Sequence, residues 1–137
     1  MEHFSQFLLC ITIHKISYTL MDYAPNGDLF EAVETKRIPF NERLVRSYFQ
    51  QIVTGVEAIH SNGAAHLDLK LENILLDNEF NAKIADFDMC YFPEDRRIMS
   101  RGTQNYRAPE IIKGNCQNAQ AADVYSLGVI LFLLKTK

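Results

Sequence analysis

The chain of 137 residues is 47% hydrophobic and 23% charged, a composition typical of one globular domain rather than a disordered segment. Its formal net charge of −3 provides no broad basic surface, so the composition argues against a protein that binds nucleic acid. Three scattered cysteines, Cys10, Cys90 and Cys116, form neither a disulfide framework nor a CxxC metal motif, and we therefore expect an intracellular, cytoplasmic protein.

The apolar stretches are too short to predict a membrane span. The longest, at residues 7 to 13 and 129 to 134, fall well below the roughly 18 residues that a spanning helix needs. We therefore expect no membrane association.

The first predicted elements are a short strand and a short helix. Residues 18 to 23 are β-prone, and the Ala-Pro-Asn-Gly sequence at 24 to 27 ends the strand with turn residues. Asp28 then provides an N-cap for a helix through Lys36, with Glu31 in the third helical position of a capping box.

A longer amphipathic helix is predicted next, from an N-cap at Asn41 to a C-terminal stop at Gly63. Its apolar side chains recur at helical spacing. They are Leu44, Val45, Tyr48, Phe49, Ile52, Val53, Val56 and Ile59.

The second half of the chain alternates short elements with a long loop. Residues 73 to 76 and 82 to 85 flank a polar turn and predict a hairpin. Residues 86 to 110 show neither helical nor strand periodicity, and a loop of that length inside a compact domain is usually functional. The last predicted element is a buried helix from Asp123 to Leu134, which is apolar on nearly every side.

Three short motifs follow one another in this half of the chain. The first reads His66-Leu67-Asp68-Leu69-Lys70-Leu71-Glu72-Asn73, the second Asp86-Phe87-Asp88 and the third Ala108-Pro109-Glu110. Together with Gly102-Thr103 and Asp123, they resemble the catalytic loop, the metal-binding loop and the end of the activation segment in eukaryotic-type protein kinases.

The resemblance implies an α+β, protein-kinase-like fold. The chain would comprise the hinge and the first part of the mainly helical large lobe, with most of the small lobe missing. Residues 1–17 would be a remnant or an uncertain N-terminal segment, and residues 18–137 a partial catalytic domain. The implied reaction is ATP-dependent phosphoryl transfer to Ser or Thr of a protein substrate. Residues 69 to 87 are most similar to the calmodulin-dependent and AMP-activated kinase group.

The resemblance also implies roles for the polar residues of the first two motifs, in a reaction that depends on positioning and charge neutralisation. Asp68 would accept the proton of the substrate hydroxyl, and Lys70 would neutralise charge that develops on the transferred phosphate. Asn73 and Asp86 would hold Mg²⁺, a hard cation that prefers oxygen ligands. Lys70 and Thr103 are typical of the Ser/Thr branch.

By the same resemblance, ATP would bind against the hinge. Met21 would be the gatekeeper, the backbone of the next three residues would meet adenine, Asp28 would meet the ribose, and two apolar residues would line the pocket. The implied nucleotide-binding residues are Met21, Asp22, Tyr23, Ala24, Asp28, Leu75 and Ala85.

Four further residues are implied to have structural roles. His66 would brace the catalytic loop, although it could instead form a metal site with His60. Thr103 would support the catalytic loop, Glu110 would pair with an Arg in later helices of the large lobe, and Asp123 would anchor the catalytic-loop backbone, cap its helix, or do both.

The sequence also departs from the family pattern. Within its 137 residues there is no Gly-rich phosphate loop, and Lys15 stands too close to the hinge to be the missing strand lysine. Leu67 replaces the Arg that gathers an activating phosphate in many kinases, which excludes switching through that residue. Asp88 replaces the glycine of the DFG motif, where we expect a backbone cost of about 1 to 2 kcal/mol.

These departures leave two alternatives to an active kinase. One is a pseudokinase or interaction module, and the other is a chain whose residues 1 to about 16 are not kinase sequence. In the activation segment, which runs from Asp86 to Glu110, Ser100 is a candidate phosphorylation site, and the basic residues Arg96, Arg97 and Arg101 are interpreted as solvating the loop.

Overall fold

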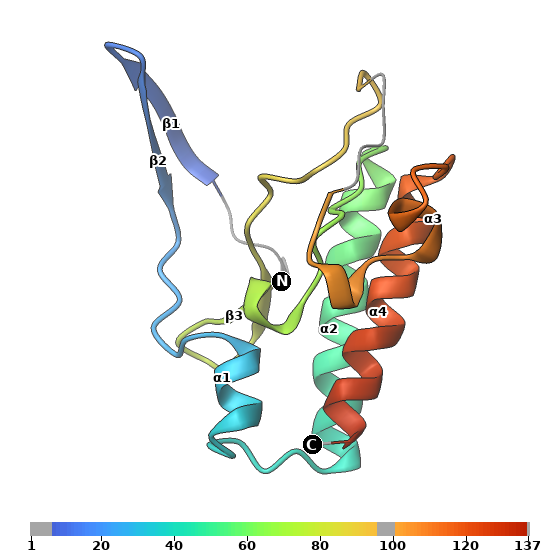
Figure 1. Ribbon diagram of the computed structural model, residues 1–137. Coiled ribbons are helices and arrows are strands. Elements are labelled where there is room, and N and C mark those ends of the chain that lie inside the picture. The colour runs from blue at the N-terminus through green and yellow to red at the C-terminus, as the bar shows by residue number, and fades with distance from the viewer. Residues whose placement is uncertain (1–6, 96–100, 137) are drawn as a thin grey trace.

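The computed structural model describes residues 7–95 and 101–136 (Figure 1). A two-stranded hairpin stands apart from a larger body built around two long helices that lie side by side. In chain order the elements are β1 (Phe7–Ile13), β2 (Ile16–Met21), α1 (Leu29–Glu34), α2 (Glu42–Ser61), the 3₁₀ turn η1 (Leu71–Asn73), β3 (Ile74–Leu76), β4 (Ala82–Ile84), the 3₁₀ turn η2 (Gln104–Tyr106), α3 (Pro109–Ile112) and α4 (Ala119–Thr136).

The N-terminal hairpin contains a strand that the sequence analysis did not predict. β1 pairs antiparallel with β2, and Ile13 lies opposite Ile16 next to the turn. The two turn residues, His14 and Lys15, have φ values of 49° and 66°. A left-handed pair of this kind forms a two-residue loop whose twist matches that of the flanking strands. Lys15 is therefore a turn residue, and β2 begins two residues before the predicted strand.

A connector, residues 22 to 27, joins the hairpin to the body. The backbone of Asn26 and Gly27 pairs with Leu76 of β3, with N···O distances of 3.2 and 2.8 Å. Asp28 then caps α1 as predicted, since its Oδ1 accepts from the backbone N–H of Glu31 at 2.7 Å. The connector is thus fixed to the body at its C-terminal end.

The two long helices form most of the body. The capping residue of α2 is Asn41, as predicted, and its side chain accepts from the Leu44 N–H at 3.0 Å. α4 begins at Ala119, four residues before the predicted start, so the prediction that Asp123 caps this helix was wrong. Asn118 is the capping side chain, because its Oδ1 accepts from the Ala121 N–H at 3.1 Å.

The apolar core lies where the two helices meet the β3–β4 hairpin. Ile52 of α2, Ile74 and Leu76 of β3, Ile84 of β4 and Ile130 of α4 are almost completely buried there. A second, smaller cluster gathers under α3. Its buried members are Ala65, Leu67, Ala108, Ile111, Ala119 and Ala122. Both clusters border the segment between α2 and β3, and packing therefore fixes that segment from two sides.

α4 is mainly apolar, although it contains the charged residues Asp123 and Lys135. It has 18 residues and a mean hydropathy of 1.2, so by length and composition alone it could cross a membrane. The core helix of a globular protein can meet the same criterion. The count of consecutive apolar residues did not reveal a segment of this length, because Gln120, Asp123 and Ser126 interrupt the apolar stretch before Val129. In the structure α4 packs lengthwise against α2 (Figure 1).

Candidate active site

A buried carboxylate on α4 holds the segment that joins α2 to β3. The side chain of Asp123 is fully buried, and its Oδ2 and Oδ1 accept from the backbone N–H groups of His66 and Leu67, each at 2.8 Å. His60 Nε2 lies 2.8 Å from the same Oδ2. A buried charge requires such partners, and here they attach the residues before Asp68 to the central helix.

His66 organises the same segment from inside. Its Nδ1 accepts from the Asp68 N–H at 3.2 Å, so the ring proton resides on Nε2, which donates to the Ala85 carbonyl at 3.0 Å. Burial lowers the pKa of His66, and the ring is neutral at pH 7. Both ring nitrogens are occupied by these hydrogen bonds, and the described residues contain no group of three His, Cys, Asp or Glu side chains that could hold a metal ion. The alternative of a metal site with His60 was therefore wrong.

Asp68 lies at the centre of a polar cluster. Its Oδ1 accepts from the N–H and the hydroxyl of Thr103, at 2.7 and 2.8 Å. Its Oδ2 lies 3.0 Å from the Lys70 ammonium, which also donates to the Thr103 hydroxyl at 3.0 Å. Thr103 comes from a segment 35 residues later and closes a triangle with Asp68 and Lys70.

These contacts keep the Asp68 carboxyl ionised. Burial favours the neutral acid, but the hydrogen bonds from Thr103 and Lys70 together outweigh it and lower the pKa of Asp68. At neutral pH the cluster therefore presents the Asp68 carboxylate beside the Lys70 ammonium. The carboxylate is held by the Thr103 N–H, the Thr103 hydroxyl and Lys70.

Asn73 and Asp86 provide oxygens suited to a divalent cation. The Asn73 amide nitrogen donates to the backbone oxygen of Asp68 at 2.9 Å and to its Oδ2 at 3.3 Å, so the amide oxygen faces away from Asp68. The backbone of Asn73 also binds the Ala85 N–H at 2.9 Å, which brings the exposed Asp86 close to it. This set of hard oxygens fits Mg²⁺.

The backbone strain lies elsewhere than expected in the second motif. Asp86 has a φ of 64°, in the left-handed region, whereas Asp88 does not have a positive φ. The expected cost at Asp88 is therefore absent from this conformation. Leu67 also has a positive φ, 62°, and its side chain is buried in the small apolar cluster.

Comparison with known proteins assigns this constellation to a family. Residues 2–137 match the protein kinase domain. The chain belongs to the protein kinase family. The fold is accordingly that of a partial kinase domain, comprising a hinge and part of the large lobe.

Three relatives of the chain are named as protein kinases, two of them as serine/threonine-protein kinases. The chain is 42% identical over 121 residues to the serine/threonine-protein kinase GIN4 of Saccharomyces cerevisiae, which covers 87% of the chain and 10% of that relative. It is 41% identical over 126 residues to the carbon catabolite-derepressing protein kinase of Secale cereale, covering 90% and 25%. It is 39% identical over 120 residues to the CBL-interacting serine/threonine-protein kinase 8 of Arabidopsis thaliana, covering 85% and 27%. The chain thus spans at most about a quarter of the length of these kinases.

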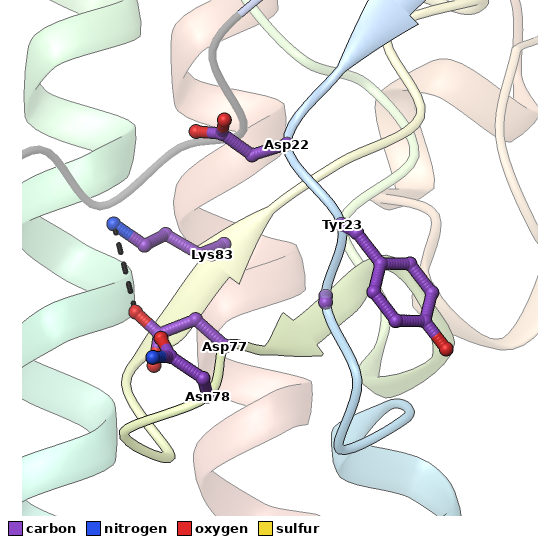
Figure 2. A pocket seen from close by; sticks show the side chains of 6 residues that line it. Asp22, Tyr23, Asp77, Asn78 and Lys83 are labelled. Atoms are coloured by element: carbon purple, nitrogen blue, oxygen red, sulfur yellow. Dashed lines mark ion pairs between the residues drawn. The ribbon is translucent and has the colours of Figure 1, made fainter.

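The predicted nucleotide-binding residues lie along the connector and the neighbouring hairpin. Leu75 is directly opposite Lys83 in the β3–β4 ladder, so both side chains project from one face. Between this hairpin and the connector lies a cavity of about 260 Å³, lined by Asp22, Tyr23, Ala24, Asp77, Asn78 and Lys83. Figure 2 shows Asp22 on the Lys83 side of the connector and the Tyr23 ring on the other side.

The kinase domain brings only some of the predicted nucleotide-binding side chains to this cavity. Met21, at the end of β2, is 44% exposed, and the Tyr23 side chain is 85% exposed. Asp28 is engaged in capping α1 and bridges to Leu75 through its backbone. Ala85 is buried, and its carbonyl accepts from His66. The sequence analysis did not identify Lys83 or Asp77, which form an ion pair at 3.9 Å.

Two contacts of the activation segment were also missed. Gly102 has a φ of 87°, and a Cβ there would lie 2.1 Å from the Leu67 carbonyl oxygen, so only glycine fits. Arg101, interpreted from sequence as solvating the loop, donates from Nη1 to the Cys90 carbonyl at 2.7 Å.

Glu110 is half-buried in the first turn of α3, and its pairing with an Arg of later helices stays a prediction. The candidate phosphorylation site Ser100 lies outside the described residues, as do Arg96 and Arg97.

Proposed function

We propose that this kinase domain transfers the γ-phosphoryl group of ATP to a Ser or Thr hydroxyl of a protein substrate. The observation that carries the proposal is the Asp68 carboxylate, held by Thr103 at 2.7 Å and paired with Lys70 at 3.0 Å. A carboxylate fixed in this way can orient a hydroxyl and accept its proton, and the adjacent ammonium can neutralise charge on the group being transferred.

Each residue of the cluster has a distinct task in this proposal. Asp68 receives the substrate hydroxyl proton, and Thr103 fixes the carboxylate so that it does not rotate away. Lys70 touches both of them, at 3.0 Å in each case, and so stays beside the site of reaction. Asn73 and Asp86 would hold Mg²⁺, which when bound draws the phosphate oxygens together and offsets their charge.

The nucleotide would lie against the connector. The backbone of Asp22 to Ala24 offers donors and acceptors along one edge of the cavity, and the Leu75 side chain offers an apolar surface beside it. We also propose an intracellular setting without membrane or nucleic-acid binding, in keeping with the net charge of −3 and the scattered cysteines.

The test compares the wild-type protein with Asp68→Asn, using Mg²⁺, ATP and peptides that contain Ser or Thr. The substituted amide keeps the shape of the carboxylate but cannot accept a proton, so we expect turnover to fall by a factor of about 10² to 10⁴. Glu57→Gln, which neutralises an exposed carboxylate on α2, is the matched control and leaves turnover unchanged. Transfer that persists in Asp68→Asn would refute the assignment.

A second candidate is a binding module without turnover, favoured by Asp88 in place of the glycine of the second motif. Its carboxylate adds negative charge two residues from Asp86, and both side chains are exposed. In that case Asp68→Asn and Asp86→Ala would leave the biological activity of the protein unchanged. Complementation of a loss-of-function strain with these two variants separates the candidates.

A further inference from the structure

Arg101 lies in the activation segment two residues before Thr103, and its guanidinium binds an earlier part of the same segment. Arg101 Nη1 donates to the Cys90 carbonyl at 2.7 Å, and lies 3.4 Å from both the Met89 carbonyl and Asp95 Oδ2. The Arg101 side chain is only 22% exposed. Its guanidinium therefore joins residue 101 to the beginning of the same segment, instead of solvating the loop.

The partner of Arg101 is itself firmly held. Cys90 donates from its N–H to the Phe87 carbonyl at 3.0 Å and from its thiol to the Ala65 carbonyl at 2.9 Å. The next residue, Tyr91, exchanges two backbone hydrogen bonds with Ala65, at 2.8 and 2.9 Å. Ala65 immediately precedes His66 of the catalytic loop. Arg101 is thus bound to a short ladder that continues directly into that loop.

In the C-terminal direction, Arg101 is followed directly by Gly102 and by Thr103 of the catalytic cluster. Gly102 passes so close to the Leu67 carbonyl that no side chain fits, and Thr103 then donates twice to Asp68. The side chain of Leu67 is buried among apolar side chains and has no polar group with which to hold this part of the segment. Two arginines hold the approach to Thr103: Arg107 Nε donates to the Gly102 carbonyl, and Arg101 ties residue 101 back to the ladder.

We propose that Arg101 is a positioning residue that holds Thr103 in register with Asp68 and Lys70. This inference rests on the proposed function, since its consequence is the placement of the catalytic carboxylate. Arg101 touches neither Asp68 nor Lys70, and it acts on them through Thr103. Because the Arg101 side chain supplies the positive charge, Thr103 is held in place without any group, such as a phosphate, being added to the activation segment.

The first test measures amide hydrogen exchange and needs no enzymatic activity. The Thr103 N–H should exchange about tenfold faster in Arg101→Ala, because a hydrogen bond to a charged group contributes enough stability to slow local opening by roughly that factor. Amides in the centre of α2 should keep their rates. Arg101→Lys should retain most of the protection, because a single nitrogen makes all the contacts. Arg43→Ala, at an exposed arginine of α2, is the matched control.

Three exchange results would overturn the proposal. An unchanged Thr103 rate in Arg101→Ala would show that the contact does not hold this residue. An equal acceleration across α2 would show that Arg101 supports the whole fold and has no particular link to Thr103. A rate in Arg101→Lys as high as in Arg101→Ala would contradict the role of the single nitrogen.

The second test is a kinetic cycle with Thr103. Arg101→Ala should lower kcat about tenfold with little change in KM for ATP, because the connector is untouched. Thr103→Ala should lower kcat as well, and the double variant should be no slower than Thr103→Ala alone. Additive losses would refute action through Thr103. If no Asp68-dependent transfer is found, the proposed function fails while the exchange experiment still decides the contact.

Discussion

Asp123→Asn tests whether one carboxylate holds the catalytic loop to α4. The substitution keeps the size of the side chain but replaces one acceptor oxygen by an NH₂ group. In the wild type, the two oxygens accept from the N–H groups of His66 and Leu67 at 2.8 Å each. Whichever way the amide is turned, one of these two backbone donors loses its acceptor and faces another donor. The bond to His60 can survive, because its imidazole can change tautomer and accept from the amide.

The magnitude follows from this count. An unsatisfied buried donor costs about 1 to 3 kcal/mol, and the bond that remains loses its charge assistance, worth roughly 1 kcal/mol more. A neutral amide is cheaper to bury than a carboxylate, which offsets part of the loss. We therefore expect Asp123→Asn to lower the free energy of unfolding by about 2 to 3 kcal/mol.

Urea denaturation followed by circular dichroism measures this change. Glu57→Gln, the same chemical change at an exposed site on α2, serves as the control and should stay within about 0.5 kcal/mol of wild type. The same small change in Asp123→Asn would refute the argument. So would a large change without faster amide exchange at Leu67, because the loss should be felt first at the catalytic loop.

The remaining predictions concern a glycine, a histidine and two thiols. Gly102→Ala should destabilise the fold by more than Gly114→Ala, because both glycines have positive φ but only the new Cβ at position 102 would meet a backbone oxygen, at 2.1 Å. Thermal denaturation of both variants measures the difference, and equal losses would contradict it. Burial lowers the pKa of His66 in the folded protein, so the unfolded chain binds more protons below the ordinary value of 6.5. Stability should therefore be complete above pH 6.5 and fall as the pH drops below it, and His66→Phe should weaken that dependence in denaturation curves. Burial raises the pKa of the Cys90 thiol to about 11, so mass spectrometry should find Cys116 alkylated well before Cys90 at pH 8; faster labelling of Cys90 would contradict its burial.

The parts of the fold that sequence predicted best are those with local signals. The caps of α1 and α2, at Asp28 and Asn41, were predicted at the correct residues because a capping side chain bonds to an amide only three positions away. The core strands β3 and β4 were placed to within one residue at each end, because a polar turn separates two short apolar runs.

The misses have physical causes. β1 was missed because its turn uses His14 and Lys15, which carry the required left-handed conformation without the Gly or Asn that normally announces it. The start of α4 was missed because residues 119 to 122, Ala-Gln-Ala-Ala, show no apolar periodicity, and Asp123 looked like a cap. α3 was hidden within the predicted loop because Pro109, which suggests a break, occupies the first helical position, where proline is well tolerated.

The candidate site shows the same division. The short spacing from His66 to Asn73 placed Asp68, Lys70 and Asn73 in one loop, and the structure joins them directly. No local rule predicts that Thr103, 35 residues later, bonds to Asp68. The contacts of Arg101 were equally hard to predict, because two of its three partners are backbone carbonyls, which leave no trace in the pattern of side chains.

The β1–β2 hairpin is joined to the body by the connector, about which it could rotate as a unit. Its strands pair only with each other in the described part of the chain, and the connector is first fixed to the body at Asn26 and Gly27. A rotation about residues 22 to 25 would therefore carry Met21 at the end of β2, while Leu75 stays with the helices. Because the cavity is lined by residues 22 to 24 of the connector on one side and by Asp77, Asn78 and Lys83 on the other, small changes in the backbone of the connector would directly change the width of the cavity.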